Sequence, residues 1–348
     1  MNFNQSKIKS FRRCQKQYSF IHDYAPEGYE LKPKYPSLPL KIGGWLHELQ
    51  EAYHLEWAGV TTKTWKEVQR ELTAQFNLLF DEEKEKYGVD LPDEAYRLFA
   101  AYRRHYRDDS EKYRVATLQD GQPGIEFVVE VPMGRHHHFK GRIDLLVEDL
   151  EYKGLWIWDA KWVRKIPSAD ERMMNPQALM YPWALKRLGY DVRGFVFNYG
   201  RKKAPTIPPL LKKGFLTTRH SLDTDVYTYL REIKRVHGES WKRLARTYYA
   251  DKIEELKARH NDWFRRERVP VDNVRINAAL REFKATVRDI LRRQTEDIPR
   301  TYVYNCPFNC DYHDPCVAEF TGRDITALLE KNFEQVEERY AKEPDLSE

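Results

Sequence analysis

The spacing of the apolar residues changes near the middle of the chain, and this change restricts the folds that the chain can adopt. Helices are expected where the spacing is helical, over 6–22, after Gly44 and over 64–116. Three strand-like segments follow, at 125–131, 139–147 and 155–163. The remaining expected elements are a helix from Asn175-Pro176, a strand at 195–199 and mainly helices over 222–294 and about 324–341. This order predicts an α/β (α+β) fold in which helices flank a central mixed β-sheet.

The composition is that of a globular protein with a sizeable core. The chain has 348 residues, of which 41% are hydrophobic and 14% aromatic, so it can form one elaborated domain or two. Lys and Arg number 59 against 54 Asp and Glu, and a net charge of +5 does not by itself indicate a polyanionic partner. Residues 241–300, however, hold 16 Lys and Arg against 10 Asp and Glu.

Neither a membrane segment nor a secretion signal is evident in the sequence. No apolar run approaches the roughly 18 residues of a spanning helix. The first residues, MNFNQSKIKSF, lack the apolar stretch of a signal peptide. We therefore expect a soluble protein of the cytoplasm.

The segment 155–163 has the composition of a buried strand but contains Asp159 and Lys161. Side chains alternate between the two faces of a strand, so these two residues share a face with Ile157 and Val163. A salt-bridged pair on a solvated sheet face is the plainer interpretation. The apolar neighbours on that face argue against full solvation.

A second acidic residue, Asp144, lies on the preceding strand segment. If the two segments form a hairpin, Asp144, Asp159 and Lys161 meet at one place. Two adjacent carboxylates repel each other unless a cation lies between them, and oxygen ligands with open positions suit Mg²⁺ or Mn²⁺. Such an ion can activate water and polarise a phosphoryl oxygen. Lys161 could orient that water or neutralise developing negative charge.

These residues resemble the motifs of the PD-(D/E)xK nuclease superfamily, in particular its RecB-like branch. The matching motifs are Gly141-Arg-Ile-Asp144, Asp159-Ala-Lys161 and Gln177-Ala-Leu-Met-Tyr181, on strand, strand and helix. The resemblance implies a metal-dependent DNA exonuclease with Asp144, Asp159 and Lys161 as catalytic residues. It further implies a role in recombination, repair or phage DNA processing, in the host cytoplasm if the protein is phage-encoded. No helicase is evident in the sequence, so a helicase or recombinase is either supplied by a partner or not needed.

The resemblance also implies a set of metal ligands. His47, in Gly43-Gly-Trp-Leu-His47, matches the position of a histidine ligand in RecB-like nucleases. The implied ligands of Mg²⁺ or Mn²⁺ are therefore His47, Asp144, Asp159 and the carbonyl of Ala160. A histidine on a helix surface is the alternative for His47.

Further residues are implied to support the site or to contact DNA. Gln177 and Tyr181 share one helical face and would lie near DNA and the catalytic lysine. Tyr181 could instead pack on the sheet, and Pro182 should kink the helix. The family often has an acidic residue where Glu126 begins the first strand, with Glu130 as the rival, and both could be surface residues.

The four cysteines are one N-terminal residue, Cys14, and a C-terminal group, Cys306, Cys310 and Cys316. Without a secretion signal, such a cluster more often binds metal than forms disulfides. Four thiolates suit Zn²⁺, although zinc ribbons usually pair two tight Cys-x-x-Cys knuckles. The arrangement resembles that of AddB-type and CRISPR-adaptation nucleases, which implies a structural 4Fe–4S cluster that joins both ends of the domain. In that group the C-terminal spacing is commonly two then five residues, whereas here it is three then five.

Two segments are candidates for contact with nucleic acid. A basic stripe at helical spacing consists of Arg281, Lys284, Arg288 and Arg292. It would bind phosphates without reading sequence, or it is a solvated helix face with ordinary salt bridges. The segment 96–107, rich in aromatic residues and Arg, could stack on a single strand, or its aromatic residues belong to the core.

We expect one integrated nuclease domain built of five parts. They are N-terminal helices at 1–47, an arch-like helical insertion at 48–120, the nuclease core at 121–204, a helical basic region at 205–300, and the cluster segment with a C-terminal helix at 301–348. Two other functions stay open: a non-catalytic DNA-binding or scaffold subunit that retains the fold, and a nuclease stabilised by zinc.

Overall fold

The chain consists of runs of helices and runs of strands, an order that fits an α+β fold. The computed structural model describes residues 1–26, 28–60, 63–87, 91–259, 263–293, 297–304 and 306–338. The helices are α1 (Gln5–Arg13), α2 (Gln15–His22), α3 (Leu38–Ala58), α4 (Trp65–Asn77), α5 (Asp81–Tyr87), α6 (Leu91–His105), α7 (Asp109–Lys112), α8 (Ala169–Met173), α9 (Pro176–Arg187), α10 (Val226–His237), the 3₁₀ helix η1 (Gly238–Ser240), α11 (Trp241–Arg246), α12 (Ala250–Ala258), α13 (Asn273–Arg292), α14 (Cys306–Asn309), α15 (His313–Phe320) and α16 (Thr326–Asn332). The strands are β1 (Asn2–Phe3), β2 (Tyr29–Pro33), β3 (Tyr113–Val115), β4 (Ile125–Pro132), β5 (His138–Asp149), β6 (Leu155–Val163), β7 (Val192–Arg201), β8 (Phe264–Pro270) and β9 (Phe333–Glu337).

The central sheet is mixed, as the sequence predicts. Its order is β1-β5-β6-β7-β8, and β3 and β4 also pair with β5. β5 and β6 form an antiparallel pair, β6 and β7 run parallel, and β7 and β8 are antiparallel. The predicted fold, a central mixed sheet flanked by helices, is therefore confirmed.

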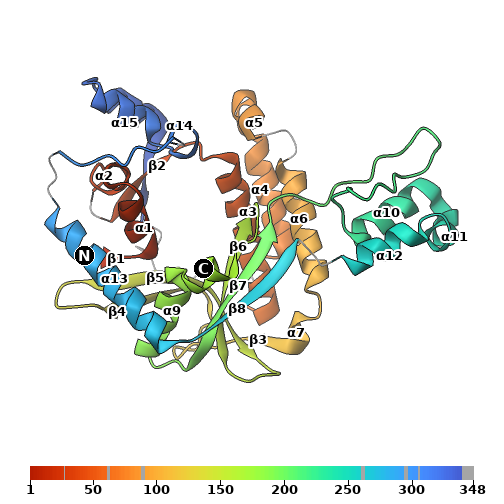
Figure 1. The fold of residues 1–348 in the computed structure, drawn as a ribbon, viewed down its shortest axis with the longest axis horizontal. Coiled ribbons are helices and arrows are strands. Elements are labelled where there is room, and N and C mark those ends of the chain that lie inside the picture. The colour runs from red at the N-terminus through yellow and green to blue at the C-terminus, as the bar shows by residue number, and fades with distance from the viewer. Residues whose placement is uncertain are drawn as a thin grey trace.

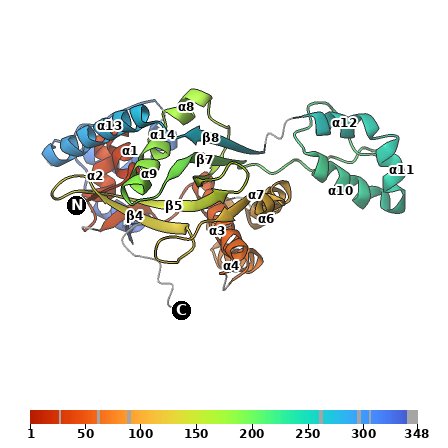
Figure 2. The same cartoon turned by 90° about the horizontal axis from the view of Figure 1, so that it is seen from below.

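Helices cover both faces of the sheet (Figures 1 and 2). On one face, α1, α9 and α13 form a core with Ile157 and Phe195, both fully buried. On the other, α3, α4 and α6 pack with Trp162. The alternation of side chains along β6 explains how a single strand contributes to both cores.

Local signals fix the start of α9. The side chain of Asn175 accepts a hydrogen bond from the backbone N–H of Gln177 over 2.9 Å, and Pro176 occupies the first helical position. This cap places Gln177 in the first turn, beside the end of β6. The helix contains Pro182 and ends only at Arg187.

Segments near the two ends of the chain form a small unit, which we call the terminal module. It contains α2, β2, α14, α15, α16 and β9. β2 and β9 form a separate antiparallel ribbon. One buried hydrophobic cluster of this module contains Phe20, Leu31, Tyr312 and Phe333. The hydroxyl of Tyr312 also donates to the carbonyl of Leu31 over 2.5 Å. Residues almost 300 positions apart in the sequence are thus held together.

A helical unit projects from the body between β7 and β8 (Figures 1 and 2). We call residues 205–259 the satellite subdomain; it contains α10, η1, α11 and α12. It has a hydrophobic core of its own, formed by Leu216, Tyr229, Ile233, Tyr249, Ile253 and Leu256.

Several predicted elements are corrected by the structure. Residues 264–270, expected in a helical region, form β8, and 333–337, expected in a C-terminal helix, form β9. Both strands are rich in charged residues and lack a clear apolar alternation, because pairing with β7 and β2 rather than side-chain burial defines them. Residues 113–115, expected as helix, and residues 29–33, where no element was expected, are strands as well. The end of the predicted 324–341 helix, from 339, lies outside the described residues.

Candidate active site

Asp144 and Asp159 lie on adjacent strands, in the hairpin that the sequence predicts. The antiparallel register of β5 and β6 brings the two residues opposite each other. The backbone N–H of Ala160 donates to Oδ2 of Asp144 over 2.9 Å. Nζ of Lys161 lies 2.6 Å from Oδ2 of Asp159. The two carboxylates and the ammonium group therefore meet at one end of the hairpin.

Three side chains from three elements could hold a metal ion here. His47 of α3, Glu126 of β4 and Asp144 of β5 each offer one ligand atom, and these atoms lie within 4.8 Å of one another. Nε2 of His47 lies 3.1 Å from the carbonyl oxygen of Ala160, which borders the same group. Two carboxylates, one imidazole and a nearby carbonyl are suitable ligands for Mg²⁺ or Mn²⁺.

The backbone of Glu126 is unusual in a way that suits this position. Its φ is +49°, a left-handed conformation that is rare for a residue with a side chain. The residue is buried, and Nε of Arg142 lies 3.3 Å from its carboxylate and donates to its carbonyl over 2.9 Å. The rival Glu130 instead pairs with His138 and Lys140 towards the other end of the strand. Glu126 is thus the acidic residue of β4 that lies at the site.

Asp159 lies outside this group of three, although it was expected among the metal ligands. Its Oδ1 accepts a 2.6 Å hydrogen bond from Nε2 of Gln177, and its Oδ2 lies next to Lys161. Its side chain is 2% exposed, against 15% for Asp144, 26% for His47 and 33% for Lys161. Asp159 therefore forms the buried side of the site, and the other three form its open side.

The helix α3 presents His47 to the sheet. Buried Leu46 and Leu49 pack in the core beside the sheet. Gly59, in the left-handed conformation with φ of +71°, ends the helix. His47 follows the first buried leucine directly and so lies at the edge of the packed face, where its ring reaches β5 and β6.

Tyr181 is a core residue rather than an exposed one. Its ring packs at an angle against Phe139 and Phe195, and the residue is 4% exposed. A Cβ atom at Gly141 would lie only 2.6 Å from Cε1 of Tyr181. The glycine of the first motif and the tyrosine of the third are therefore packed against each other, as the packing alternative for Tyr181 predicts.

The four cysteines come together in the terminal module. The helix expected over 6–22 is interrupted at Cys14, which is extended between α1 and α2. Cys14, Cys306, Cys310 and Cys316 line one cavity of about 80 Å³, and none of them forms a disulfide. The backbone N–H groups of Thr301 and Val303 donate to the sulfurs of Cys14 and Cys306, over 3.4 and 3.3 Å. Burial raises the pKa of the Cys310 thiol.

Sulfur ligands with nearby N–H donors fit a metal centre. Thiolates bind Zn²⁺ and iron–sulfur clusters alike, and hydrogen bonds to the sulfurs are typical of both. Among the described residues, no three cysteine sulfurs lie within 4.8 Å of one another. Four sulfurs bound to one Zn²⁺ would be about 3.8 Å apart, because the Zn–S bonds are about 2.3 Å long and point to the corners of a tetrahedron.

The predicted basic stripe lies on α13. Arg281, Lys284, Arg288 and Arg292 are all exposed. The opposite face buries Phe283, Val287 and Ile290. None of the four cations forms an ion pair with another described residue, so the stripe differs from a helix face held by ordinary salt bridges.

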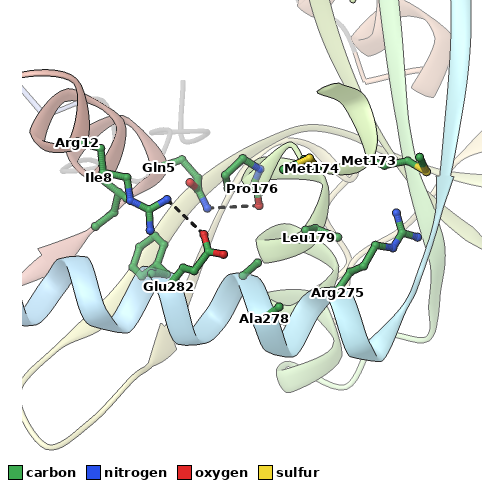
Figure 3. Close-up of a pocket in the computed structure, with 12 residues that line it drawn as sticks. Gln5, Ile8, Arg12, Met173, Met174, Pro176, Leu179, Arg275, Ala278 and Glu282 are labelled. Carbon is green, nitrogen blue, oxygen red and sulfur yellow. Dashed lines mark hydrogen bonds and ion pairs between the residues drawn. The ribbon is translucent and has the colours of Figure 1, made fainter. Parts of the chain in front are cut away.

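A pocket of about 230 Å³ opens between α1, α13 and the start of α9 (Figure 3). Arg12 and Glu282 face each other at 3.7 Å on one side of it, and Gln5 donates to the carbonyl of Pro176. Arg275 lies at the other end. The pocket adjoins the first turn of α9, one residue before Gln177, but the carboxylates of the site do not line it.

The segment 96–107 is mainly a core segment. Phe99 and Tyr102 are buried, and Tyr102 accepts a 2.6 Å hydrogen bond from Asn198 of the sheet. Tyr96 is exposed and stacks on Trp65. The aromatic residues of α6 thus hold α6 to the body, and only Tyr96 remains open to a ligand.

One residue at the site was not singled out from the sequence. Arg142 pairs with Glu126, which is one of the three possible metal ligands. It lies within the motif Gly141-Arg-Ile-Asp144, one position from its start. Arg142 and Asp144 are two residues apart on β5, so their side chains lie on the same face of the strand. This spacing could have identified Arg142 from the sequence.

Two carboxylates on strands of a mixed sheet and an imidazole from α3, beside a lysine, are typical of metal-dependent nucleases. The model of the PD-(D/E)XK nuclease superfamily matches residues 2–317, and the chain belongs to this superfamily. Membership implies metal-dependent hydrolysis of phosphodiester bonds in nucleic acids, for which Mg²⁺ or Mn²⁺ is typical. A search of curated proteins gives no significant match.

No helix among the described residues combines the length and the apolar character needed to cross a membrane.

Proposed function

We propose that this protein is a DNA exonuclease of the RecB-like branch, acting in recombination, repair or phage DNA processing. One observation carries the proposal: His47, Glu126 and Asp144 converge on one point, beside the Asp159–Lys161 pair. The absence of any separate base-reading module in the described residues favours action at ends over cutting at a defined sequence.

The residues of the site take different roles in this proposal. His47, Glu126 and Asp144 would hold Mg²⁺ or Mn²⁺, with the Ala160 carbonyl as a further ligand. The bound ion would supply an activated water and polarise a phosphoryl oxygen. Lys161 orients the attacking water and neutralises negative charge that develops on the phosphate. Asp159 holds Lys161 in place through their ion pair and would add its negative charge beside the metal ligands.

The basic stripe of α13 would guide the strand to this site. A strand that passes Gln177 next meets Pro176 and the pocket that contains Arg12 and Arg275. The exposed cations of α13 lie on the same helix as Arg275, which lines this pocket. Contacts of this kind bind phosphates, depend strongly on salt and do not depend on base sequence.

The four cysteines would hold a structural 4Fe–4S cluster. Among the described residues, no three of these sulfurs lie within 4.8 Å of one another, which supports a cluster over one tetrahedral Zn²⁺. The cluster would fix Cys14, near the N-terminus, to the C-terminal group, and so restrict the unfolded chain over a very long loop. Broad visible absorption and a brown colour are expected in protein purified without oxygen. A colourless protein with one equivalent of zinc would overturn this assignment.

The main test compares linear with covalently closed DNA. End-labelled single- and double-stranded linear DNA and a closed circle are incubated with the protein and Mn²⁺, Mg²⁺ or EDTA. Metal-dependent loss of the labelled ends from linear DNA, with the circle intact, is expected. Cleavage of the circle would overturn the exonuclease assignment.

Asp159→Ala separates catalysis from contamination in this assay. The variant should lose activity with both metals, because Lys161 then lacks its partner and the site loses one carboxylate. Equal degradation by both proteins would mean that a contaminant cuts the DNA, whereas a wild type that binds DNA but cuts nothing would favour the scaffold subunit.

A further inference from the structure

The satellite subdomain is an insertion that the sheet does not need. β7 and β8 are neighbouring antiparallel strands, paired from Gly194 with Pro270 to Gly200 with Phe264. The backbone N–H of Arg201 also bonds to the carbonyl of Trp263, over 2.9 Å. A short hairpin turn would suffice to join two such strands. Instead, the chain forms a helical unit with its own hydrophobic core, which projects away from the body (Figure 2).

The charge of the satellite subdomain is positive and concentrated. Residues 205–259 hold 12 Lys and Arg against 7 Asp and Glu. The helix α11, with the sequence WKRLAR, has three cations and no acidic residue. A module with this excess attracts polyanions.

Most acidic residues of the satellite subdomain form ion pairs or cap a helix within the protein. Asp223 is paired with Arg201 at the base of the unit, and Asp225 caps α10. Glu232 is buried against Arg231 and Arg235, and its carboxylate cannot offset charges elsewhere on the surface. 

The pairs of α12 act in the same way. Glu254 is paired with Lys257, and Glu255 with Lys252 and Arg259. Because these acidic residues form ion pairs within the unit, they do not neutralise the other cations that are exposed to solvent.

Seven cations of the unit are exposed and lack an ion-pair partner among the described residues. They are Lys212, Lys213, Arg219, Lys234, Lys242, Arg243 and Arg246. Three of them lie within six residues, on α11. Tyr248, which is exposed and packs on Phe215, lies just after this helix and could stack on a base or a sugar.

We propose that the satellite subdomain is a second nucleic-acid-binding surface, which grips the phosphate backbone of the substrate outside the active site. This inference rests on the proposed function in taking DNA as the polyanion. The exposed cations of α11 bind phosphates, and the separate core of the unit holds them clear of the nuclease body. The protein therefore binds long DNA more tightly than DNA that fills only the active site.

The test uses the full-length chain and a triple variant, Lys242→Ala with Arg243→Ala and Arg246→Ala. All three side chains are exposed, so the fold of the unit should persist. A matched control removes the same charge from the terminal module, as Lys34→Ala with Arg323→Ala and Lys331→Ala. Binding is measured by fluorescence anisotropy in EDTA, with a labelled duplex of one helical turn and another of several turns, over a range of salt concentrations.

For the long duplex, the triple variant should bind about tenfold or more weakly, and the slope of log K against log[salt] should fall in magnitude by about 2 to 3. Binding of the short duplex should change by less than about twofold, since the active site alone can hold it. The control should match the wild type. An unchanged slope for the long duplex, or an equal fall in the control, would overturn the proposal; the first result would point to an acidic protein as the partner of this surface.

Failure of this inference is distinguishable from failure of the proposed function. Anisotropy in EDTA measures binding without catalysis, whereas digestion with Mn²⁺ measures catalysis at the metal site. If the wild type cuts linear DNA but the triple variant binds DNA as tightly as the wild type, the proposed function stands and the satellite surface is refuted. If the wild type binds DNA through α11 but cuts nothing, the satellite surface stands and the proposed function is refuted.

Discussion

Gln177 donates a hydrogen bond from its side-chain amide to Oδ1 of Asp159, and the two atoms are 2.6 Å apart. The other carboxylate oxygen lies 2.6 Å from Nζ of Lys161. Asp159 is thus held from one side by the first turn of α9 and from the other by its own strand. In this chain, the helix that carries Gln177 therefore positions Asp159 through a neutral hydrogen-bond donor.

Removing this donor should slow catalysis without weakening binding. Gln177→Ala is expected to lower kcat by about 10- to 100-fold, as is typical when a residue that orients a catalytic carboxylate is lost. KM for DNA should stay near that of the wild type, because the amide contacts Asp159. Steady-state kinetics on an end-labelled oligonucleotide measures both constants.

Replacing Gln177 by glutamate should change the pH dependence of activity in a way that loss of structure alone would not. Gln177→Glu places a second carboxylate beside Asp159, so the pKa of the pair rises and activity should recover partly as the pH is lowered. A pH profile identical to that of Gln177→Ala, or full activity in either variant, would contradict the positioning role.

The two glutamates of β4 offer a matched pair for testing the metal site. Glu126 lies with His47 and Asp144, whereas Glu130 is partly exposed and pairs with His138. Glu126→Gln should raise the Mn²⁺ concentration needed for half-maximal activity by about tenfold or more, because an amide oxygen binds a hard cation less well than a carboxylate. Glu130→Gln should leave it unchanged. A metal titration in which the two variants behave alike would exclude Glu126 from the ligand set.

The sequence predicted the catalytic hairpin well because short-range rules govern it. β6 has the predicted limits, 155–163, since strict alternation of side chains identifies a strand that contributes to two cores. The cap at Asn175 likewise placed α9 and Gln177. These elements depend on neighbouring residues alone.

What the sequence did not predict depends on distant contacts. β8 reads FRRERVP, with no apolar alternation, and becomes a strand because β7 offers an unpaired edge. The choice between Glu126 and Glu130 depends on the pairing of β4 with β5, which places Glu130 opposite Lys140 and leaves Glu126 near Asp144. The burial of Tyr181 depends on the space that Gly141 leaves across the core.

His22 should make the protein less stable in acid. Burial, and then the positive charges of Lys7, Arg293 and Lys32, lower the pKa of His22 from its usual 6.5 to about 3. The folded protein keeps this ring neutral, whereas the unfolded chain takes up a proton below about pH 6.5. Its contribution to stability is therefore complete above that pH and is lost progressively as the pH falls towards 3, by up to about 1.4 kcal/mol per pH unit.

His22→Phe tests this directly. Phenylalanine keeps the ring that packs on Tyr18, with centroids 4.5 Å apart in the wild type, but cannot bind a proton. The free energy of unfolding, measured with urea at a series of pH values, should fall less steeply between pH 6 and pH 4 in the variant, by about one proton's slope. Parallel curves for the two proteins would show that other groups cause the acid sensitivity.

Gly141 should tolerate no side chain, for a reason unconnected with its backbone. An added Cβ would lie 2.6 Å from the ring of Tyr181 and 3.4 Å from that of Phe139, both fixed in the core. Gly141→Ala is therefore expected to lower the free energy of unfolding by about 1–3 kcal/mol, as overpacking typically does. Gly44→Ala is the control: it lies inside α3 with nothing within 4 Å of its added Cβ, so it should gain about 0.5–1 kcal/mol.

A double-mutant cycle assigns the cost to the contact with Tyr181. Tyr181→Leu removes the ring atom that an alanine at Gly141 would strike, so the double variant should be more stable than the sum of the two single losses predicts. Urea unfolding of the four proteins gives the coupling energy. Additive losses, or a Gly141→Ala variant as stable as Gly44→Ala, would show that the sheet moves aside at this point and that the glycine is not required by packing.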